Sequence, residues 1–332
     1  MGDLPIVRIG VDLGGTKIFT VALKGTEVVA EAKSKTPVQG GPLAVVDAMA
    51  ATVRALGVGS EAEAVGVGAP GVIDFRSGVV HSAPNLTGWV EPFRLGPALS
   101  EALGGTSVTV DNDVNVGTVA EHQMGAAVGS RDVLGVFVGT GVGGGLILNN
   151  RLRRGASGYA GEIGHVVVRP GGRRCGCGGR GHLEAYAGRA GMERRARQHE
   201  ARGRDTLLVE LSRTRRMTSS VFARALEARD PIAVALVDRA VETLGLALSM
   251  ATTLMDIPMV VLGGGLADRL GPSFVARVEE AALALVPNGR ADTLRVVPAA
   301  LSDRGGAIGA ALSARVRRPR SSAADGRARV TT

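Results

Sequence analysis

Aromatic residues are scarce in this chain of 332 residues, since phenylalanine, tyrosine and tryptophan together make up 3% of it. The core must therefore be built mainly from valine, leucine, isoleucine and alanine, which suits buried sheets flanked by helices. The sequence also lacks an apolar run of membrane length, and Met1–Ile9 lacks the charged start and long apolar stretch of a signal peptide. We therefore expect a cytoplasmic protein without a membrane partner.

Cysteine is almost absent, with only Cys175 and Cys177, one residue apart. This spacing cannot close a long loop through a disulfide, so a metal site is the better question. His165 and His182 lie close to the pair in the sequence. Thiolates and imidazoles in a glycine-rich loop favour tetrahedral zinc, and no adjacent base or open position indicates a catalytic metal. The alternative is two free thiols beside unrelated surface histidines.

Acidic residues are fewer than basic ones, which gives a formal net charge of +8. The basic residues concentrate at Arg151–Arg154, at Arg194–Arg216 and in the tail after Arg315. We interpret most of them as solvated surface and expect no specific nucleic-acid partner. Residues 318–332 are rich in arginine, serine and alanine, and we expect them to form a disordered basic tail.

Glycine is abundant, with 49 residues, and much of it falls in clusters that mark turns. The segment Val7–Asp12 predicts a strand, followed by a tight turn over Gly14–Thr16 and a returning strand. The same pattern recurs with a strand over Asp132–Val138, a turn over Gly139–Gly145 and a return over Leu146–Asn149. Two such units, about 125 residues apart, indicate two related halves that each cradle part of one extended anion.

The remaining pattern is α/β, and the length favours two domains. We expect helices over Pro42–Leu56, Val114–Met124, Ser220–Met255 and Gly305–Val316, and further strands over Phe19–Leu23, Ala64–Gly68, Ser107–Val110 and Met259–Leu262. The boundary is expected near Asp113, with the final helix returning to the first domain. Residues 1–113 and 305–317 would then form a smaller domain, and 114–304 a larger one that carries the metal loop.

Glycine turns suit phosphates because a backbone without Cβ atoms can approach closely and point several N–H groups at one oxygen. Neither turn is a P-loop, and the first could be only a hairpin turn. Gly139, Gly141 and Gly144 match the dinucleotide fingerprint G-x-G-x-x-G. That fingerprint must open a helix, whereas this turn leads into an expected strand, so hydride transfer is a minor alternative.

Asp113 follows an expected strand and precedes an expected helix, where a carboxylate can face a cleft and accept a hydroxyl proton during phosphoryl transfer. The alternative is that Asp111, Asn112 or Asp113 caps the helix, and both uses can coexist among three residues. Glu162 and Glu184 bracket the metal loop. Their carboxylates could bind a neutral polyol, or they could be ordinary solvated side chains.

Taken together, these motifs resemble the ROK family of repressors, open reading frames and kinases, over about Ile9 to Leu312. The matching segments are Asp12–Lys17, Gly68–Gly71, Pro84–Leu86, Asn112–Asp113, Gly139–Gly145, Gly161–His165, Cys175–Gly178, Gly263–Gly265 and Gly309–Ala311. The resemblance implies a two-domain actin-like (ribonuclease H-like) ATPase fold of the α/β class, with an interdomain cleft.

The resemblance also implies an activity, the ATP-dependent phosphorylation of the 6-hydroxyl of glucose, with Asp113 as general base. The sugar-binding residues would be Gly71, Asn112, Asp113, Glu162, His165 and Glu184. Asp12 would orient Mg²⁺. ATP would lie against the residues of two turns, Gly14, Gly15, Thr16, Lys17, Gly139, Thr140 and Gly141. Its adenosine would lie beside a third turn, at Gly263 and Gly264.

The family usually has a third cysteine where this chain has His182. Imidazole can replace thiolate in a tetrahedral site, so we expect a structural Cys₂His₂ zinc site made by His165, Cys175, Cys177 and His182. His165 would bind zinc through one ring nitrogen and the sugar through the other.

Several alternatives stay open at this point. The same scaffold serves N-acetylmannosamine, N-acetylglucosamine, fructose and allose kinases, and polyphosphate could replace ATP. A sugar-responsive regulator is disfavoured, because the first turn begins at Asp12 and leaves no room for a preceding DNA-binding domain. An inactive sugar-binding protein is disfavoured by the complete set of base and phosphate motifs. The resemblance implies a homodimer or homotetramer.

Overall fold

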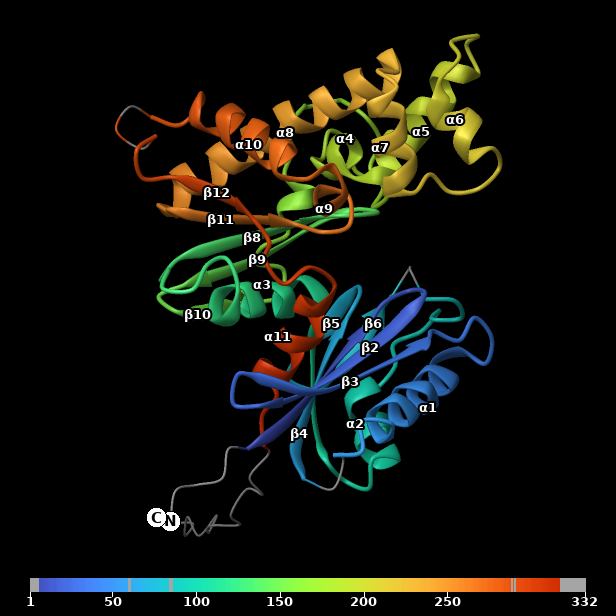
Figure 1. The fold of residues 1–332 in the computed structure, drawn as a ribbon, viewed down its shortest axis with the longest axis vertical. Coiled ribbons are helices and arrows are strands. Elements are labelled where there is room, and N and C mark those ends of the chain that lie inside the picture. The colour runs from blue at the N-terminus through green and yellow to red at the C-terminus, as the bar shows by residue number, and fades with distance from the viewer. Residues whose placement is uncertain (1–5, 59–60, 84–85, 288, 290, 317–332) are drawn as a thin grey trace, which may run out of the picture.

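The computed structural model describes residues 6–58, 61–83, 86–287, 289 and 291–316, and its elements are arranged around two five-stranded sheets (Figure 1). The first sheet has the order β3-β2-β1-β4-β7. Its strands are β1 (Val7–Leu13), β2 (Lys17–Lys24), β3 (Glu27–Lys35), β4 (Ala62–Ala69) and β7 (Ser107–Asn112). Strand β1 pairs antiparallel with β2 and parallel with β4, and β4 pairs parallel with β7.

The second sheet repeats this arrangement, with the order β10-β9-β8-β11-β12. Its strands are β8 (Val133–Val138), β9 (Val142–Leu148), β10 (Arg151–Arg153), β11 (Met259–Gly263) and β12 (Arg295–Pro298). Strand β8 pairs antiparallel with β9 and parallel with β11, as β1 does with β2 and β4. The prediction of two related halves is therefore confirmed. Strands β5 (Val72–Asp74) and β6 (Val79–Ser82) form a separate pair.

Helices cover both sheets, as predicted for an α/β chain. Near the first sheet lie α1 (Gly41–Arg54) and α2 (Leu95–Ala102), and near the second lie α4 (Glu184–Ala187), α5 (Arg189–Glu200), α6 (Leu207–Ser212), α7 (Ser219–Glu227), α8 (Pro231–Met255), α9 (Ala267–Leu270) and α10 (Pro272–Leu283), as Figure 1 shows. Two 3₁₀ turns span Ile163–His165 and Ser302–Arg304. Among the described residues, no helix is both long and apolar enough to cross a membrane.

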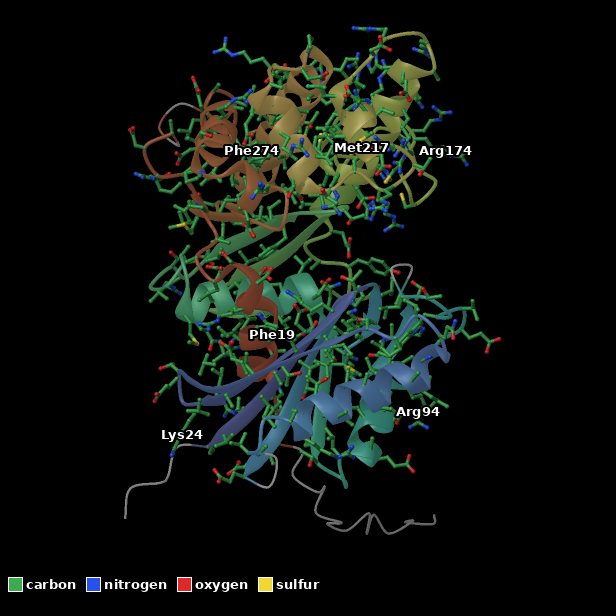
Figure 2. All side chains as sticks on the ribbon, turned by 45° about the vertical axis from the view of Figure 1, so that its right-hand side comes forward. Phe19, Lys24, Arg94, Arg174, Met217 and Phe274 are labelled. Carbon is green, nitrogen blue, oxygen red and sulfur yellow. The ribbon has the colours of Figure 1, made fainter. Side chains whose placement is uncertain are left out.

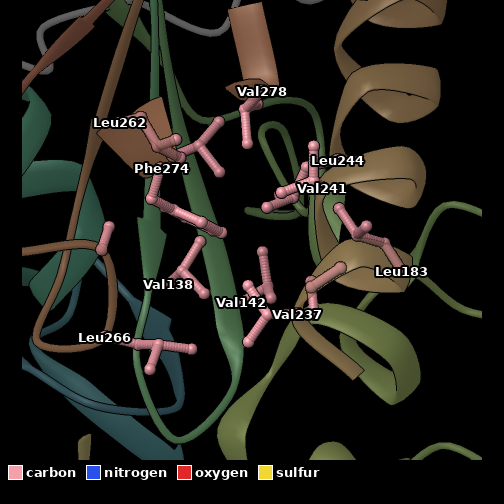
Figure 3. Packing of buried hydrophobic residues seen from close by; sticks show 14 of the residues in the cluster. Val138, Val142, Leu183, Val237, Val241, Leu244, Leu262, Leu266, Phe274 and Val278 are labelled. Carbon is pink, nitrogen blue, oxygen red and sulfur yellow. The ribbon is translucent and has the colours of Figure 1, made fainter. Parts of the chain in front are cut away.

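Aliphatic side chains form the core of the second half, as the shortage of aromatics requires. Val138 and Val142 of the sheet face Val237, Val241 and Leu244 of α8 (Figure 3). Phe274 of α10 is one of the few aromatic rings in this cluster. In Figure 2, Phe19 lies in the other half, where it packs against Ala307 and Ile308 of the last helix.

The predicted turn over Gly139–Gly145 is wrong in its second part, because β9 already begins at Val142. The three glycines that follow are part of the strand, and α3 (Asp113–Met124) packs against two of them. A Cβ atom on Gly143 would lie 2.6 Å from Cγ2 of Val114, and one on Gly145 would overlap the hydroxyl of Thr118. Close helix packing, not a turn, explains Gly143 and Gly145, while a Cβ atom on Gly144 would overlap the carbonyl oxygen of Gly161.

Two predicted helix ranges need correction. The helical patterns expected over Ser220–Met255 form two helices, because Asp230 caps a new helix by accepting a hydrogen bond from the backbone N–H of Ala233 (2.7 Å). Pro231 occupies the first turn of that helix, where its missing N–H costs nothing. The closing helix α11 (Gly305–Ser313) ends three residues before the expected Val316. The tail predicted for 318–332 lies outside the described residues, as do Pro84 and Asn85 of the Pro84–Leu86 motif.

Helix α11 lies between the first sheet and α3, close to both. The close approach depends on glycines. A Cβ atom on Gly10 of β1 would overlap the carbonyl oxygen of Ala307, and one on Gly66 of β4 would overlap that of Ala310. On the other side, a Cβ atom on Gly309 would overlap the carbonyl oxygen of Val116 in α3.

We expect Gly66→Ala to lower the free energy of unfolding by about 3 kcal/mol, because the new methyl group must push α11 off the sheet. Gly25→Ala is the control, because its Cβ atom would meet open space. Its only cost is that of alanine in a left-handed conformation, about 1 to 2 kcal/mol. Urea unfolding of both variants measures the difference. Equal losses would contradict the packing argument.

Candidate active site

The carboxyl end of β7 leads directly into α3 and carries three polar residues in a row. Asn112 caps the helix, with its side-chain oxygen accepting from the backbone N–H groups of Val114 (2.9 Å) and Asn115 (3.3 Å). The capping alternative considered for this segment is therefore correct for Asn112. Asp113 is the first helical residue and does not serve as the cap.

Asp113 has an unusual electrostatic environment. Burial, together with the charges of Asp12 and Glu162, raises the pKa of its carboxyl to about 7, while a hydrogen bond from the backbone N–H of Val114 (2.9 Å) opposes the rise. The structure thus brings together the carboxylates of Asp12, Asp113 and Glu162, which come from three separate segments of the chain. A carboxylate with a pKa near neutrality can accept a proton and release it again.

Asp12, near the end of β1, is also held in a desolvated position. Burial raises its pKa to about 6, although the charge of Lys17 opposes the rise. The carboxylate lies against the start of α11, where a Cβ atom on Gly306 would be 2.7 Å from Cγ of Asp12. A buried carboxylate without a direct cationic partner within the described residues suits a hard cation such as Mg²⁺.

The first glycine turn joins β1 to β2. Gly14 donates its N–H to the carbonyl of Lys17 (2.9 Å), and its own carbonyl accepts from the hydroxyl of Thr36 (2.7 Å). Gly15 and Thr16 are exposed at the tip. Lys17 pairs with Asp303 at 2.8 Å, but the pair is solvent-exposed and therefore weak.

The second glycine turn joins β8 to β9 and is held by Glu184. One carboxylate oxygen of Glu184 accepts from the backbone N–H of Val142 (3.2 Å), and a Cβ atom on Gly141 would overlap it. The other oxygen accepts from the thiol of Cys175 (3.4 Å). The structure thus places Glu184, predicted to bind sugar, between the turn and the cysteine loop.

The third turn follows β11 and lies beside the end of β8. Gly264 has φ of +90°, and a Cβ atom there would be 2.7 Å from the backbone nitrogen of Val138. Leu266 donates to the carbonyl of Val138 (2.9 Å). The predicted adenosine turn at Gly263 and Gly264 is therefore adjacent to the strand that leads into the second glycine turn.

A cleft opens at the carboxyl end of β7, between the two halves. Its lining residues are Gly71, Val72, Ile73, Phe75, Asp111, Asn112, Asn115, Gly144, Arg154, Gly158, Tyr159, Ala160 and Glu162. Gly71 has φ of +96° and accepts from the side-chain amide of Asn112 (3.2 Å). Three predicted sugar residues, Gly71, Asn112 and Glu162, line this cleft, whereas Asp113, His165 and Glu184 are not among its lining residues.

Arg154 is an exception to the interpretation that most of the basic residues are solvated surface. Its guanidinium pairs with Asp111 through Nε (2.7 Å) and Nη2 (2.5 Å), and the two side chains are only 17% and 4% exposed. It also lies over the ring of Phe75, 4.6 Å from the centroid. The pair joins the loop after β10 to β7, the strand that leads into the predicted base, and sequence spacing gave no signal of this contact.

The four predicted metal ligands converge. One ligand atom from each of His165, Cys175, Cys177 and His182 lies within 4.8 Å of all the others. Sγ of Cys177 is 3.2 Å from Nδ1 of His182, and Sγ of Cys175 is 3.9 Å from Nδ1 of His165. Zinc bound at about 2.0 to 2.3 Å to each atom requires such separations, so the residues fit a tetrahedral ion.

His165 presents its two ring nitrogens to different groups. Nδ1 faces the cysteine cluster, while Nε2 lies 3.8 Å from Oε2 of Glu162, which lines the cleft. The arrangement agrees with the predicted division of the ring between metal and sugar. Without a cation, burial raises the pKa of the Cys175 thiol to about 11, so a thiolate there needs a metal.

Known proteins are similar to this chain over almost its whole length. The ROK family model matches residues 8–316 of this chain. The glucokinase of Streptomyces coelicolor is 33% identical over 315 residues, which cover 93% of this chain and 98% of that protein.

Two solved structures are similar to this one. The ROK hexokinase of Thermus thermophilus has a TM-score of 0.76 and 35% identity, covering 92% of this chain and 97% of that one. The ROK family glucokinase of Streptomyces griseus, solved with glucose and AMPPNP, has a TM-score of 0.77 and 32% identity, covering 92% and 98%. The predicted actin-like α/β fold is confirmed, while the domain boundaries 1–113 with 305–317 and 114–304 remain a prediction.

The raised pKa of Asp113 predicts a stability change. The folded protein holds this proton up to about pH 7, whereas the unfolded chain loses it near its ordinary value of 3.8, so stability falls as pH rises between the two. Asp113→Asn removes that loss. We expect a higher Tm than the parent at pH 8, by about 2 to 4 °C per kcal/mol gained, and a smaller difference at pH 4.5, where only the first part of the loss of stability has accrued.

Asp111→Asn is the matched control for this measurement. It removes a charge from the neighbouring residue but breaks the buried pair with Arg154, so it should lower Tm at both pH values. A fall in Tm for Asp113→Asn at pH 8 would show that the carboxylate is not a destabilising buried charge.

Proposed function

We propose that this chain, which belongs to the ROK family, is an ATP-dependent hexose kinase that converts glucose to glucose 6-phosphate. The observation that carries the proposal is Asp113, whose pKa of about 7 arises from burial beside Asp12 and Glu162. A base of this kind, adjoining a polar cleft and two glycine turns, matches the needs of phosphoryl transfer to a hydroxyl. The similarity to glucokinases over almost the whole chain supports glucose as the acceptor.

In the proposed reaction, Asp113 accepts the proton of the sugar 6-hydroxyl as that oxygen attacks the γ-phosphorus of ATP. A bond forms between the sugar oxygen and phosphorus, and the bond from phosphorus to the β,γ-bridging oxygen breaks, so ADP leaves with the electron pair. Gly71, Asn112 and Glu162 orient the sugar from the cleft, with His165 and Glu184 as the remaining predicted contacts. Orientation and charge stabilisation supply most of the rate in such reactions.

The two glycine turns bind the ATP phosphates in this proposal. The exposed tip at Gly15 and Thr16 and the turn at Gly139–Gly141 offer backbone N–H groups to phosphate oxygens. Mg²⁺ neutralises the phosphate charge when it is bound, and Asp12 orients it. Gly263 and Gly264 would lie beside the adenosine.

Zinc has a structural role in this proposal. His165, Cys175, Cys177 and His182 would hold it, and the ion would fix the loop between the cleft and the second turn. The fixed loop keeps Nε2 of His165 beside Glu162 and keeps Glu184 on the backbone of Val142. We also retain a cytoplasmic location and a homodimer or homotetramer as predictions.

The experiment that tests the function is ADP release from MgATP with glucose, mannose, fructose, N-acetylglucosamine and N-acetylmannosamine, with Asp113→Asn as the blank. We expect turnover with glucose well above the others. Loss of the base should lower kcat by about 10² to 10⁴ while the KM for glucose changes little. In the parent enzyme, kcat/KM should rise with pH up to about pH 7 and then level off, because the base must be unprotonated.

The outcomes separate the alternatives. If the enzyme prefers an acetylated sugar, the proposed mechanism stands but the substrate is not glucose. If tripolyphosphate is active in place of ATP, the phosphoryl donor is not restricted to ATP. No turnover with any sugar would contradict the kinase proposal. Near-parental turnover of Asp113→Asn would exclude Asp113 as the base.

Zinc binding is tested with two substitutions of one ligand. We expect the purified chain to hold about one zinc per molecule, His182→Ala to lose it, and His182→Cys to keep it, because thiolate and imidazole are both good zinc ligands. Metal analysis and Tm measure the result, with His199→Ala as the control histidine. Clearly less than one zinc per chain in an active parent protein would overturn the site.

A further inference from the structure

Arg189, the first residue of α5, is attached to the second glycine turn by its backbone. Its N–H donates to the carbonyl of Gly139 (3.0 Å), and the next N–H, of Ala190, donates to that of Thr140 (2.9 Å). Gly188 allows the approach, since a Cβ atom there would be 3.2 Å from Cα of Gly141. The start of α5 and the turn are therefore held together as one unit.

The side chain of Arg189 extends along the same turn. Nη2 donates to the hydroxyl of Thr140 (2.8 Å), and Nη1 donates to the hydroxyl of Ser219 at the start of α7 (3.0 Å). Because the Thr140 oxygen accepts this bond, its own hydrogen is free to be donated to another group. The guanidinium has five N–H donors, and these contacts use two of them.

Arg189 forms no ion pair within the described residues, although the charge of Glu193 acts on it and opposes the lowering of its pKa. Among the described residues, no carboxylate lies within ion-pair distance of its guanidinium, in contrast to Arg154 and Arg197. Glu193, on the same helix, is already bonded to Arg197 (2.9 Å) and to the backbone N–H of Met217 (3.1 Å). Burial lowers the pKa of Arg189, which means that its charge is partly removed from water.

A partly desolvated cation with spare donors and no ion-pair partner of its own is stabilised when an anion binds to it. The turn that it touches is one of the two expected to bind phosphate. We infer that Arg189 is a phosphate-binding residue, which contacts a phosphate of the bound nucleotide and orients the Thr140 hydroxyl toward the same group. The inference rests on the proposed function for the identity of the nucleotide.

The position of Ser219 adds a reason for nucleotide rather than free phosphate. Helix α7, which begins at Ser219, contacts α9, the helix that follows the Gly263–Gly264 turn. Arg189 therefore bridges the phosphate turn and the elements near the proposed adenosine site. A guanidinium at this junction lies between the two ends of an extended nucleotide.

The test compares Arg189→Met, which removes the charge, with Arg189→Lys, which keeps it, and with Arg194→Met, an exposed arginine on the same helix. Dissociation constants for MgADP and for adenosine are measured by calorimetry. We expect Arg189→Met to weaken MgADP binding about 10- to 100-fold, since a charge-assisted hydrogen bond is lost, and to change adenosine binding by less than about twofold. Arg189→Lys should fall between, and Arg194→Met should match the parent.

Kinetics provides the second measurement. The KM for MgATP should rise in Arg189→Met while the KM for glucose stays within about twofold, because the residue acts on the nucleotide side only. Equal losses for MgADP and adenosine, or unchanged MgADP binding in a variant with the parental Tm, would overturn the inference. A parent chain that binds MgADP but phosphorylates no sugar would refute the kinase proposal and leave the binding test of Arg189 intact.

Discussion

The close packing of α11 against β1, β4 and α3 is the constraint on which the rest of the molecule depends. Glycines on β1, on β4 and on α11 itself make it possible, because a single Cβ atom at Gly10, Gly66 or Gly309 would overlap a backbone carbonyl. This packing brings the end of β1 and the start of α3 to the same place. The carboxylates of Asp12 and Asp113 become neighbours because the backbones that carry them can approach this closely.

Such an arrangement has an energetic cost that the surrounding structure must offset. Two carboxylates with raised pKa values are less stable when ionised than they would be in water. The cap supplied by Asn112 and the buried pair of Asp111 with Arg154 hold the segment in place at no similar cost. The destabilising charge is therefore at Asp113, while its two preceding residues hold the segment in place.

The sequence allowed the α/β class, the repeated halves and the metal cluster to be predicted, since each depends on local patterns. The equal strand order of both sheets follows from two similar strand and turn units. What it could not provide were contacts between distant segments. The pairing of Arg154 could not be predicted, because a run of arginines carries no sign of the Asp111 that faces it. Gly143 was predicted to lie in a turn, because its contact with Val114 is visible only in the fold.

Glu184 explains why the metal loop and the phosphate turn should act together. One of its oxygens lies 3.4 Å from Sγ of Cys175, and the other accepts from the backbone of Val142 directly after the second turn. Arg189 fixes the same turn from the opposite end of α4, through Gly139 and Thr140. The short helix between them is therefore anchored at both ends to the turn. The cysteine loop, the second glycine turn and the cleft residue Glu162 are therefore connected through Glu184 and His165.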